Sequence, residues 1–133
     1  MRSAILHGAA ALATFAFGLT SAPEAGATTV LTTPIAITSN GQFLLCLITN
    51  IDKKPIAVTA QLFDPTFGNP VAPVSNNCPV PPATLAPGSG CIVNAGANRI
   101  VYVVVTTSSA KVRAALDVFD AAGSLQVHIP ATK

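Results

Sequence analysis

Apolar side chains form short unbroken runs, or alternate with polar ones, along most of the chain after residue 27. A short unbroken apolar run predicts a β-strand covered on both faces, whereas strict alternation predicts a strand with one inward face. Residues 43–49 and 100–107 are unbroken runs, so we expect two central strands there. Residues 56–63 and 112–119 alternate at least in part, so we expect two strands with one face in the core.

A last alternating segment, residues 125–129, lies close to the C-terminus. Because successive side chains of a strand point to opposite faces, Leu125, Val127 and Ile129 are predicted to face the core. The polar residues between the apolar ones, here and in 112–119, are predicted to face solvent. These outward residues are Arg113, Asp117, Gln126 and His128.

Turn residues separate the predicted strands. Asn40–Gly41 is a strong two-residue hairpin signal, so we expect residues 30–38 to pair with 43–49. Pro34 cannot donate a backbone hydrogen bond, which favours a place at a sheet edge for the segment 30–38. Residues 71–74 are predicted to form a second short edge strand. The Pro-rich segment that follows them is predicted to be an irregular loop, after which a strand is expected to resume over 91–94.

The spacing of these segments predicts the fold class. Residues 28–133 contain seven or eight short apolar segments rich in Val, Ile and Thr, which fit the pleated surface of a strand. Proline and glycine interrupt them throughout, as is typical of sandwiches and barrels. We therefore expect an all-β domain, an immunoglobulin-like β-sandwich of seven to eight strands after an N-terminal signal helix. A small closed barrel is the alternative.

The N-terminus has the features of a secretory signal peptide. A charged start precedes the apolar stretch Ala9–Leu19, and Ala25–Ala27 supplies the small residues that signal peptidase recognises. The apolar stretch is shorter than the roughly 20 residues that a membrane-spanning helix needs, which argues against a membrane anchor. We expect a signal peptide over 1–27 with cleavage after Ala27. A single exported domain over 28–133, periplasmic or extracellular and without a membrane span, would remain.

The three cysteines fit an exported protein, because paired cysteines persist in oxidising compartments. Three is an odd number, so at least one is unpaired within the chain. Cys78 and Cys91 bracket the Pro-rich loop, and a disulfide between them would stabilise the fold by about 3 kcal/mol in the chain-entropy model. Cys46 lies in a predicted central strand, where we expect a buried free thiol. The alternative pairing is Cys46 with Cys91.

Charge and histidine content narrow the function. The chain has 7 Lys and Arg, 5 Asp and Glu and a formal net charge of +2, with its basic residues scattered. Nucleic-acid binding needs a clustered basic face, so we expect no nucleic-acid partner. A hydrolytic triad needs a His between an acid and a nucleophile. After residue 27 the one His is His128, which the alternation predicts to be a surface residue, so we expect no enzyme.

The remaining polar residues do not match a metal or cofactor site. Zinc favours four Cys or His ligands and blue copper needs two His and one Cys, more than this chain offers. Asp117 and Asp120 are close in sequence, but calcium takes six or more oxygens, so we expect a solvated strand residue at 117 and a turn residue at 120. Ser89 lies between two glycines without the spacing of a nucleophile elbow, so we expect a turn residue. We predict no metal, no cofactor and no catalytic residue.

Several positions together resemble a known group of proteins. The elements are an apolar strand with Cys46 that is followed by Asn50, a strand that ends at Asp64, a Leu-x-Pro-Gly turn over 85–91, and the segment 112–116. In these features the chain resembles a broad group of uncharacterised bacterial exported proteins with an immunoglobulin-like β-sandwich. The resemblance implies the same fold and implies no specific function, because one fold supports many functions.

Two classes of function fit these observations. The first is an exported binding or structural module that docks to a protein or a cell-surface polymer through exposed strand edges near Val30 and Val71. The second is a carbohydrate-binding module, which would need exposed aromatic rings. Phe67 is the one aromatic residue in an apparent loop, whereas Tyr102 lies in a central strand and is expected to pack in the core. We expect the first class.

Overall fold

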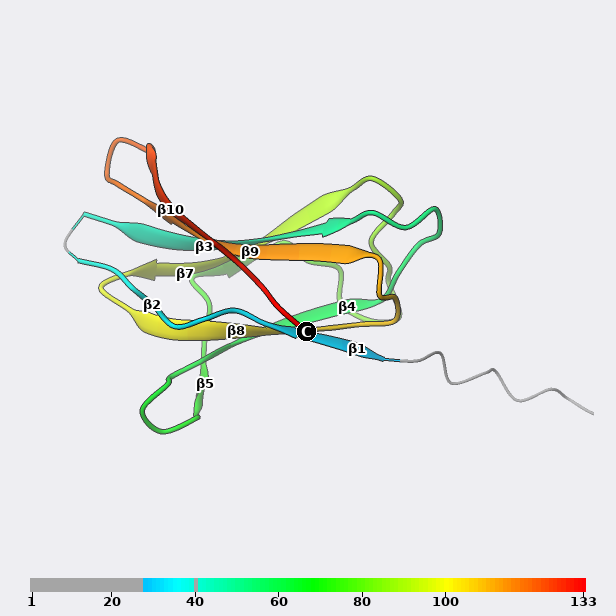
Figure 1. The fold of residues 1–133 in the computed structure, drawn as a ribbon, viewed down its shortest axis with the longest axis horizontal. Coiled ribbons are helices and arrows are strands. Elements are labelled where there is room, and N and C mark those ends of the chain that lie inside the picture. Colours follow the sequence, from blue (N-terminus) through cyan, green and yellow to red (C-terminus); the bar gives the residue numbers. More distant parts are fainter. Residues whose placement is uncertain (1–27, 40) are drawn as a thin grey trace, which may run out of the picture.

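The computed structural model describes residues 28–39 and 41–133. Within these residues the chain forms ten β-strands and no helix, and the strands build two antiparallel sheets (Figure 1). The prediction of an all-β chain is confirmed. The predicted signal peptide over 1–27, its helix and its cleavage after Ala27 lie outside the described residues.

The first sheet has β8 (Ile100–Thr107) at its centre. On one side of β8 lies β4 (Val58–Phe63), and β5 (Pro70–Val71) pairs with the end of β4. On the other side β1 (Thr29–Thr32) and β2 (Ala36–Ile37) pair one after the other with β8. The strands β1 and β5 therefore lie at the two ends of this sheet, as the sequence predicts for both edges.

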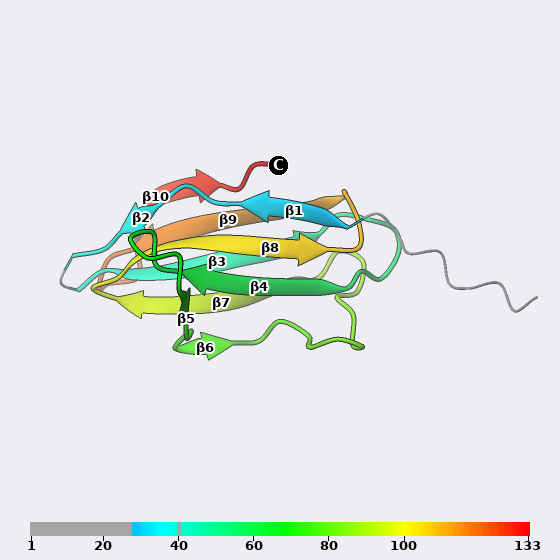
Figure 2. The same cartoon turned by 90° about the horizontal axis from the view of Figure 1, so that it is seen from below.

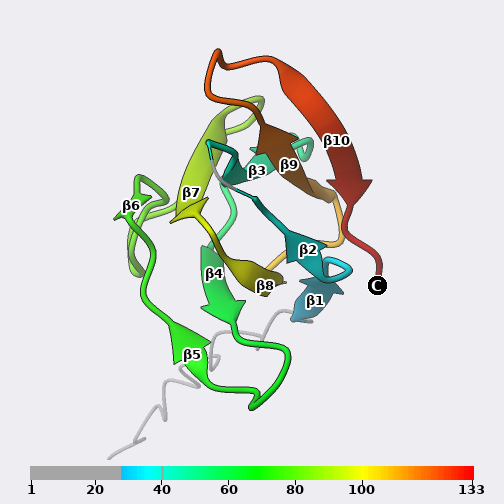
Figure 3. The same cartoon turned by 90° about the vertical axis from the view of Figure 1, so that its left-hand side faces the viewer.

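The second sheet has β3 (Phe43–Asn50) at its centre, between β7 (Gly90–Ala97) and β9 (Val112–Phe119). Beyond β7 lies β6 (Ser75–Asn76), and beyond β9 lies β10 (Leu125–Pro130). Figure 3 shows the two layers, with β10, β1 and β2 on one side and β4, β5, β6 and β7 on the other. Each strand of four or more residues overlaps a segment that the sequence predicts to be a strand.

The core lies between the sheets and consists of the inward side chains of the central strands. In β3 and β8 every second residue is buried, and Leu44, Ile48 and Val103 have no exposed surface. Burying an aliphatic side chain of this size stabilises a fold by about 1.5–3 kcal/mol relative to leaving it exposed. This inner face fixes the register of both central strands, because a slip by one residue would turn the apolar set outward.

The outward side chains of the central strands are mostly half-buried, whereas the unbroken apolar runs predict cover on both faces. Phe43 stacks on Phe119 with ring centres 5.4 Å apart, and Phe63 stacks on Tyr102 with ring centres 5.3 Å apart. Tyr102 therefore packs on the outer face of its sheet, not in the core as predicted. The apolar runs reflect cross-strand pairs on the outer faces, not a third layer of structure.

The strands that precede and follow Asn40–Gly41 in the chain, β2 and β3, lie in different sheets and are not paired, so the predicted hairpin is wrong. The preceding strand, β2, pairs with β8, whereas β3 pairs with β7 and β9. Gly41 has a φ of 79°, a conformation that glycine adopts without steric cost. Gly41 is therefore in a turn conformation, but the apolar faces of β2 and β3 decide which strands they pair with.

The predicted strand over 30–38 is split into β1 and β2 by an irregular stretch that contains Pro34. Thr33 keeps this stretch attached to β8. Its N–H donates to the C=O of Val103 at 3.0 Å, and its Oγ1 accepts from the N–H of Val103 at 2.9 Å. The missing N–H of Pro34 thus interrupts the strand without detaching it from the sheet.

The strand β10 is largely exposed, which contradicts the prediction that its apolar residues face the core. Leu125 and Val127 are 52% and 48% exposed, and Ile129 is the one that packs against the core. Val127 does lie on the inner face, as the alternation predicts, because it is directly opposite the buried Val118. However, β10 is the outermost strand of its sheet, where the other sheet covers it little (Figure 3).

The two long sides of the sandwich differ. On one side Thr32 and Thr132 exchange two backbone hydrogen bonds of 2.8 and 3.0 Å, so the segment after β10 joins the second sheet to β1. On the other side β5 and β6 have two residues each, so they cover little of β4 and β7 (Figure 2). The strands remain in two separate sheets, so the alternative of a closed barrel is wrong.

Candidate functional site

Two residues of β4 point their backbone groups away from β8 and have no strand paired with them on that side. In an antiparallel sheet, successive residues point their N–H and C=O alternately to one neighbouring strand and to the other. The C=O of Ala57 accepts from the N–H of Ser108 at 3.1 Å, so odd-numbered residues of this strand face β8. The groups of Val58 and Ala60 therefore point away from β8. No hydrogen bond between described residues uses them.

Burial makes these backbone groups unusual. Val58 is 1% exposed, so its N–H and C=O are out of contact with solvent as well as unpaired. More than nine in ten buried backbone groups of proteins have a hydrogen-bond partner. A buried group without one costs about 1–3 kcal/mol. The edge of β4 at Val58 is therefore unpaired but covered, and residues 78–81 of the Pro-rich loop line the small hollow beside it.

The unpaired stretch of β4 is short and has defined ends. At one end Ile56 and Leu85 exchange two backbone hydrogen bonds of 2.8 and 3.1 Å. At the other end Leu62 pairs with Val71 of β5. Residues 58–60 thus lie in a gap between two segments that already pair with the same edge.

Two hollows adjoin this gap. One has a volume of about 410 Å³ and the other of about 140 Å³. Ala60 and Asn76 line both hollows, which places them along the same edge. No Asp, Glu, Lys, Arg or His lines either hollow. Apolar lining residues include Leu62, Val71, Pro73 and Val93 in the larger hollow, and Val58, Pro79, Val80 and Pro81 in the smaller one.

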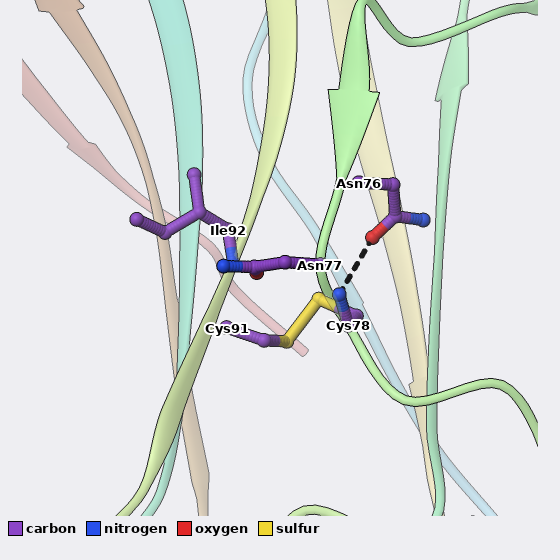
Figure 4. Close-up of a disulfide and its surroundings, with 5 residues drawn as sticks. All are labelled: Asn76, Asn77, Cys78, Cys91 and Ile92. Atoms are coloured by element: carbon purple, nitrogen blue, oxygen red, sulfur yellow. Dashed lines mark hydrogen bonds between the residues drawn. A yellow bond between two sulfur atoms is a disulfide. The ribbon is translucent and has the colours of Figure 1, made fainter.

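The disulfide holds the wall opposite β4. Cys78 is bonded to Cys91 of β7 with their Cα atoms 4.8 Å apart, which is the pairing that the sequence favours over Cys46–Cys91 (Figure 4). Asn76 accepts the N–H of Cys78 at 2.9 Å, and Asn77 accepts the N–H of Ile92 at 2.5 Å. The start of the Pro-rich loop is thus attached to β7 by one covalent bond and by side-chain hydrogen bonds.

Cys46 is a buried free thiol, as the sequence predicts. It lies on the inner face of β3 and has no exposed surface. Burial raises the pKa of this thiol to about 12, and the negative charge of Asp117 contributes to the same rise. Because the thiolate is the reactive form, Cys46 is inert at neutral pH in the folded protein.

His128 and Asp117 form a cross-strand pair on the outer face of the second sheet. The two residues are directly opposite each other in β10 and β9, and His128 Nδ1 lies 2.6 Å from Asp117 Oδ1. The His128 side chain is 58% exposed, as predicted, but Asp117 is buried at 6% exposure, which contradicts the prediction of a solvated residue. Asp117 lies between Leu45 of β3 and His128 in the sheet, and these neighbours shield it.

The pair lies in a hollow of about 520 Å³ that Thr49 and Arg113 also line. An acid beside a His is two thirds of a hydrolytic triad, so the nearest hydroxyl matters. Thr49 is opposite Arg113, four positions along β9 from Asp117. Four strand residues span about 13 Å, so the Thr49 hydroxyl is out of hydrogen-bond reach of His128. The geometry gives the pair a structural role, since His128 supplies a partner for a buried carboxylate.

The other candidate residues take turn positions. Asp120 Oδ1 accepts the N–H groups of Ala122 and Ser124 at 2.9 and 2.8 Å, so this carboxylate organises its own turn. Ser89 donates its N–H to Ala86 at 3.1 Å in the turn before β7. Neither residue lies against the His128 pair. In the described part of the chain no three His, Cys, Asp or Glu side chains gather as metal ligands would.

The exposure of Phe67 matters for the alternative prediction of a carbohydrate-binding module. Its side chain is 76% exposed in the turn between β4 and β5. The two stacked pairs described above use Phe43, Phe63, Tyr102 and Phe119 for cross-strand packing. Phe67 is therefore the one aromatic side chain of the described residues that remains free to stack on a sugar ring.

Sequence reasoning missed two structural residues. Asn50 is fully buried: its Nδ2 donates to the C=O of Lys54 and of Leu85, both at 2.9 Å, and its Oδ1 accepts from Asp52 at 2.8 Å. Asn77 holds the loop to β7, as described above. A polar residue at the end of an apolar strand is a signal for such a role, because a buried amide must be hydrogen-bonded.

Comparisons with protein-family models, with curated proteins and with solved structures found no match for this chain. Among the described residues there is no helix of the length and apolar character that crossing a membrane would require.

Proposed function

We propose that this protein is an exported, non-enzymatic β-sandwich module that docks to another protein, as a binding or structural component of the cell surface. One observation carries the proposal: β1 and β10 are the outermost strands of their sheets, and their residues Val30 and Val127 are 49% and 48% exposed. An extended segment that pairs with a sheet edge gains main-chain hydrogen bonds and needs no special side chains. That mode of binding suits a chain with few charged groups.

Export is supported by two features. The N-terminal segment has the pattern of a signal peptide, and the described residues contain the Cys78–Cys91 disulfide. Disulfides are rare in the cytosol, where thiols are kept reduced. We therefore place the protein in the periplasm or outside the cell.

We also propose that the sandwich is immunoglobulin-like. The neighbours β3, β7 and β6 follow one another as the B, E and D strands of such domains do, and β4 lies beside β8 as C lies beside F. The terminal strands differ: β1 joins the sheet of β4 and β8, and β9 joins the sheet of β3. The resemblance to exported proteins with this fold supports the same proposal. The ten strands exceed the predicted seven to eight, but only seven of them have four or more residues.

Photo-crosslinking in the secreting cell tests the docking function. A photo-reactive residue is placed at position 30 or 127, which are exposed sites on the outermost strands β1 and β10, or at the exposed position 80 in the Pro-rich loop beside β4. We expect the same partner protein in a discrete adduct from at least one position. Irradiated cells that give the free protein from all three positions would contradict docking.

A second candidate function is carbohydrate binding, which the exposure of Phe67 favours. A glycan array probed with the protein and with Phe67→Ala tests it. A signal that the substitution abolishes would support a sugar-binding role. An empty array would leave docking to a protein as the function.

A further inference from the structure

The hollow of about 520 Å³ along β9 has polar side chains at its two ends. At one end Thr49 and Arg113 are directly opposite each other in β3 and β9. At the other end Asp117 and His128 are opposite each other in β9 and β10. Arg113 and Asp117 are four positions apart in one strand, so the two ends are separated by about 13 Å. A ligand that fills the hollow therefore meets different polar groups at its two ends.

The middle of the hollow is apolar. Ala115 lies in the sheet between Leu47 of β3 and Pro130 of β10, and its methyl group is shorter than the side chains of both neighbours. This difference in length leaves space above β9. Further apolar residues extend the lining: Leu31, Val112, Ala114 and Ala131. Small-molecule sites have volumes of roughly 300–1,000 Å³ and combine such a lining with a few convergent polar groups, and this hollow has both properties.

Basic side chains gather at the Arg113 end of the hollow, although they are scattered in the sequence. The β3–β4 and β8–β9 connections lie at the same end of the sandwich (Figure 1), and the N–H of Ile51 donates to the C=O of Lys111 at 3.1 Å. Of the 7 Lys and Arg residues, four lie in or next to these connections: Lys53, Lys54, Lys111 and Arg113. The one acidic residue of the two connections is Asp52, which accepts a hydrogen bond from Ser109 at 2.6 Å. This end therefore carries an excess of positive charge.

Arg113 is the basic residue that lines the hollow together with His128. It is exposed, and no carboxylate of the described residues lies within ion-pair distance of it. A guanidinium presents paired N–H donors that match two oxygens of a carboxylate or a phosphate. The Thr49 hydroxyl, directly opposite on β3, supplies a further donor at the same end. Charge and donors at this end therefore select an anionic group.

The His128 end selects a hydrogen-bond donor. His128 Nδ1 lies 2.6 Å from Asp117 Oδ1, and a carboxylate can only accept, so Nδ1 carries the proton. In the neutral ring Nε2 is then an acceptor. An O–H or N–H of a ligand can donate to it. A second anionic group is disfavoured at this end, because the negative charge of Asp117 would repel it.

We propose that this hollow binds a small organic anion. The carboxylate or phosphate group of the ligand lies on Arg113, its apolar body covers Ala115, and a hydroxyl or N–H group at its far end donates to His128. This function goes beyond docking to another protein, because it uses the face of a sheet and does not require strand pairing. The two functions can therefore be refuted separately.

An NMR titration of the isotope-labelled secreted protein with N-acetyltyrosine tests the site, because this probe has a carboxylate, an aromatic body and a hydroxyl. N-acetyltyrosinamide is the matched neutral probe. Arg113→Gln removes the positive charge, and Ala115→Leu puts a larger side chain into the hollow. Arg99→Gln is the matched control, because Arg99 is also exposed but lies between β7 and β8 and does not line the hollow.

We expect N-acetyltyrosine to shift the amide signals of Arg113, Ala115 and His128 along one binding curve. Arg113→Gln should weaken its binding about tenfold, because a charge-assisted hydrogen bond is lost, and Arg99→Gln should leave it unchanged. N-acetyltyrosinamide should bind the native protein about as weakly as N-acetyltyrosine binds Arg113→Gln. Ala115→Leu should weaken the binding of both probes. Phenyl phosphate and benzoate, which share their ring, should both bind, and the tighter of the two identifies the preferred anionic group.

Several results would overturn the proposal. Equal losses of affinity in Arg113→Gln and Arg99→Gln would show only non-specific attraction to positive charge. Equal affinity of the native protein for the acid and its amide would refute recognition of an anion. Binding that Ala115→Leu leaves unchanged, or no signal shift at the highest soluble concentration of the acid, would refute the hollow as the site. None of these results changes the crosslinking outcome that tests docking.

Discussion

Removal of the disulfide measures how strongly the chain depends on the wall of the candidate site. The two cysteines are separated by 13 positions in sequence, so the bond closes a short loop. In the chain-entropy model a loop of this size lowers the entropy of the unfolded state by about 10 cal/mol/K, which is about 3 kcal/mol at 25 °C. We expect Cys78→Ala/Cys91→Ala to lower the free energy of unfolding by about that amount. This is a large part of the roughly 5–15 kcal/mol that small proteins have.

Urea unfolding followed by circular dichroism gives the free energy and its dependence on denaturant. The double variant should also show a larger m-value, because an unfolded chain without the cross-link exposes more surface. Cys46→Ala is a control for loss of a cysteine without loss of the bond. A free-energy change below about 1 kcal/mol, with an unchanged m-value, would show that the native loop is held by its hydrogen bonds and that the chain-entropy argument fails for this protein.

Three further predictions concern single side chains. His128→Ala should lower the free energy of unfolding by about 1–3 kcal/mol, because it leaves the buried Asp117 carboxylate without its partner. The same substitution made in an Asp117→Leu protein should have little effect, and equal losses with and without Asp117, measured by urea unfolding, would refute the coupling. Burial raises the pKa of Cys46 from 9.0 to about 12, so the stabilisation by the protonated thiol is complete below pH 9.0 and is lost as the pH rises toward about 12. Over this range the free energy of unfolding should therefore fall less in Cys46→Ala than in the native protein, and parallel plots of unfolding free energy against pH would contradict this. The Ser109 hydroxyl donates to Asp52 at 2.6 Å and is the main cause of the lowered pKa of that carboxyl, so the ionised carboxylate stabilises the fold above pH 3.8 and this stabilisation is lost as the pH falls through the lowered pKa. An NMR titration of Ser109→Ala should show the pKa of Asp52 rising toward 3.8, and an unchanged titration would refute the assignment.

The predicted strands agree with the structure where alternation or an apolar run extends over six or more residues. Segments 100–107 and 112–119 match β8 and β9 in both bounds. The Asn40–Gly41 hairpin failed because a turn signal is local, whereas strand partners depend on which faces meet in the core. The exposure of Leu125 and Val127 was missed for a related reason, since alternation tells which face a residue is on but not whether another sheet covers that face.

The candidate site was predictable in part. Cysteine spacing and loop length identified Cys78–Cys91, because both arguments depend on local chain length. The edge near Val71 was also predictable from its short apolar segment. The unpaired groups of Val58 and Ala60 were not, because a strand that reads as regular gives no sign of a neighbour that pairs with only part of it. The burial of Asp117 likewise depended on Leu45 and His128, which lie on other strands.

Amide hydrogen exchange along β4 of the free protein tests the main structural claim most directly. The amides of Thr59 and Gln61 face β8, and those of Val58 and Ala60 face away from it. Slow exchange at 59 and 61 with exchange at least about tenfold faster at the partly exposed residue 60 would support an edge without a strand partner. Equal protection of the amides of 59, 60 and 61 would show that this edge is already paired, which would contradict the account.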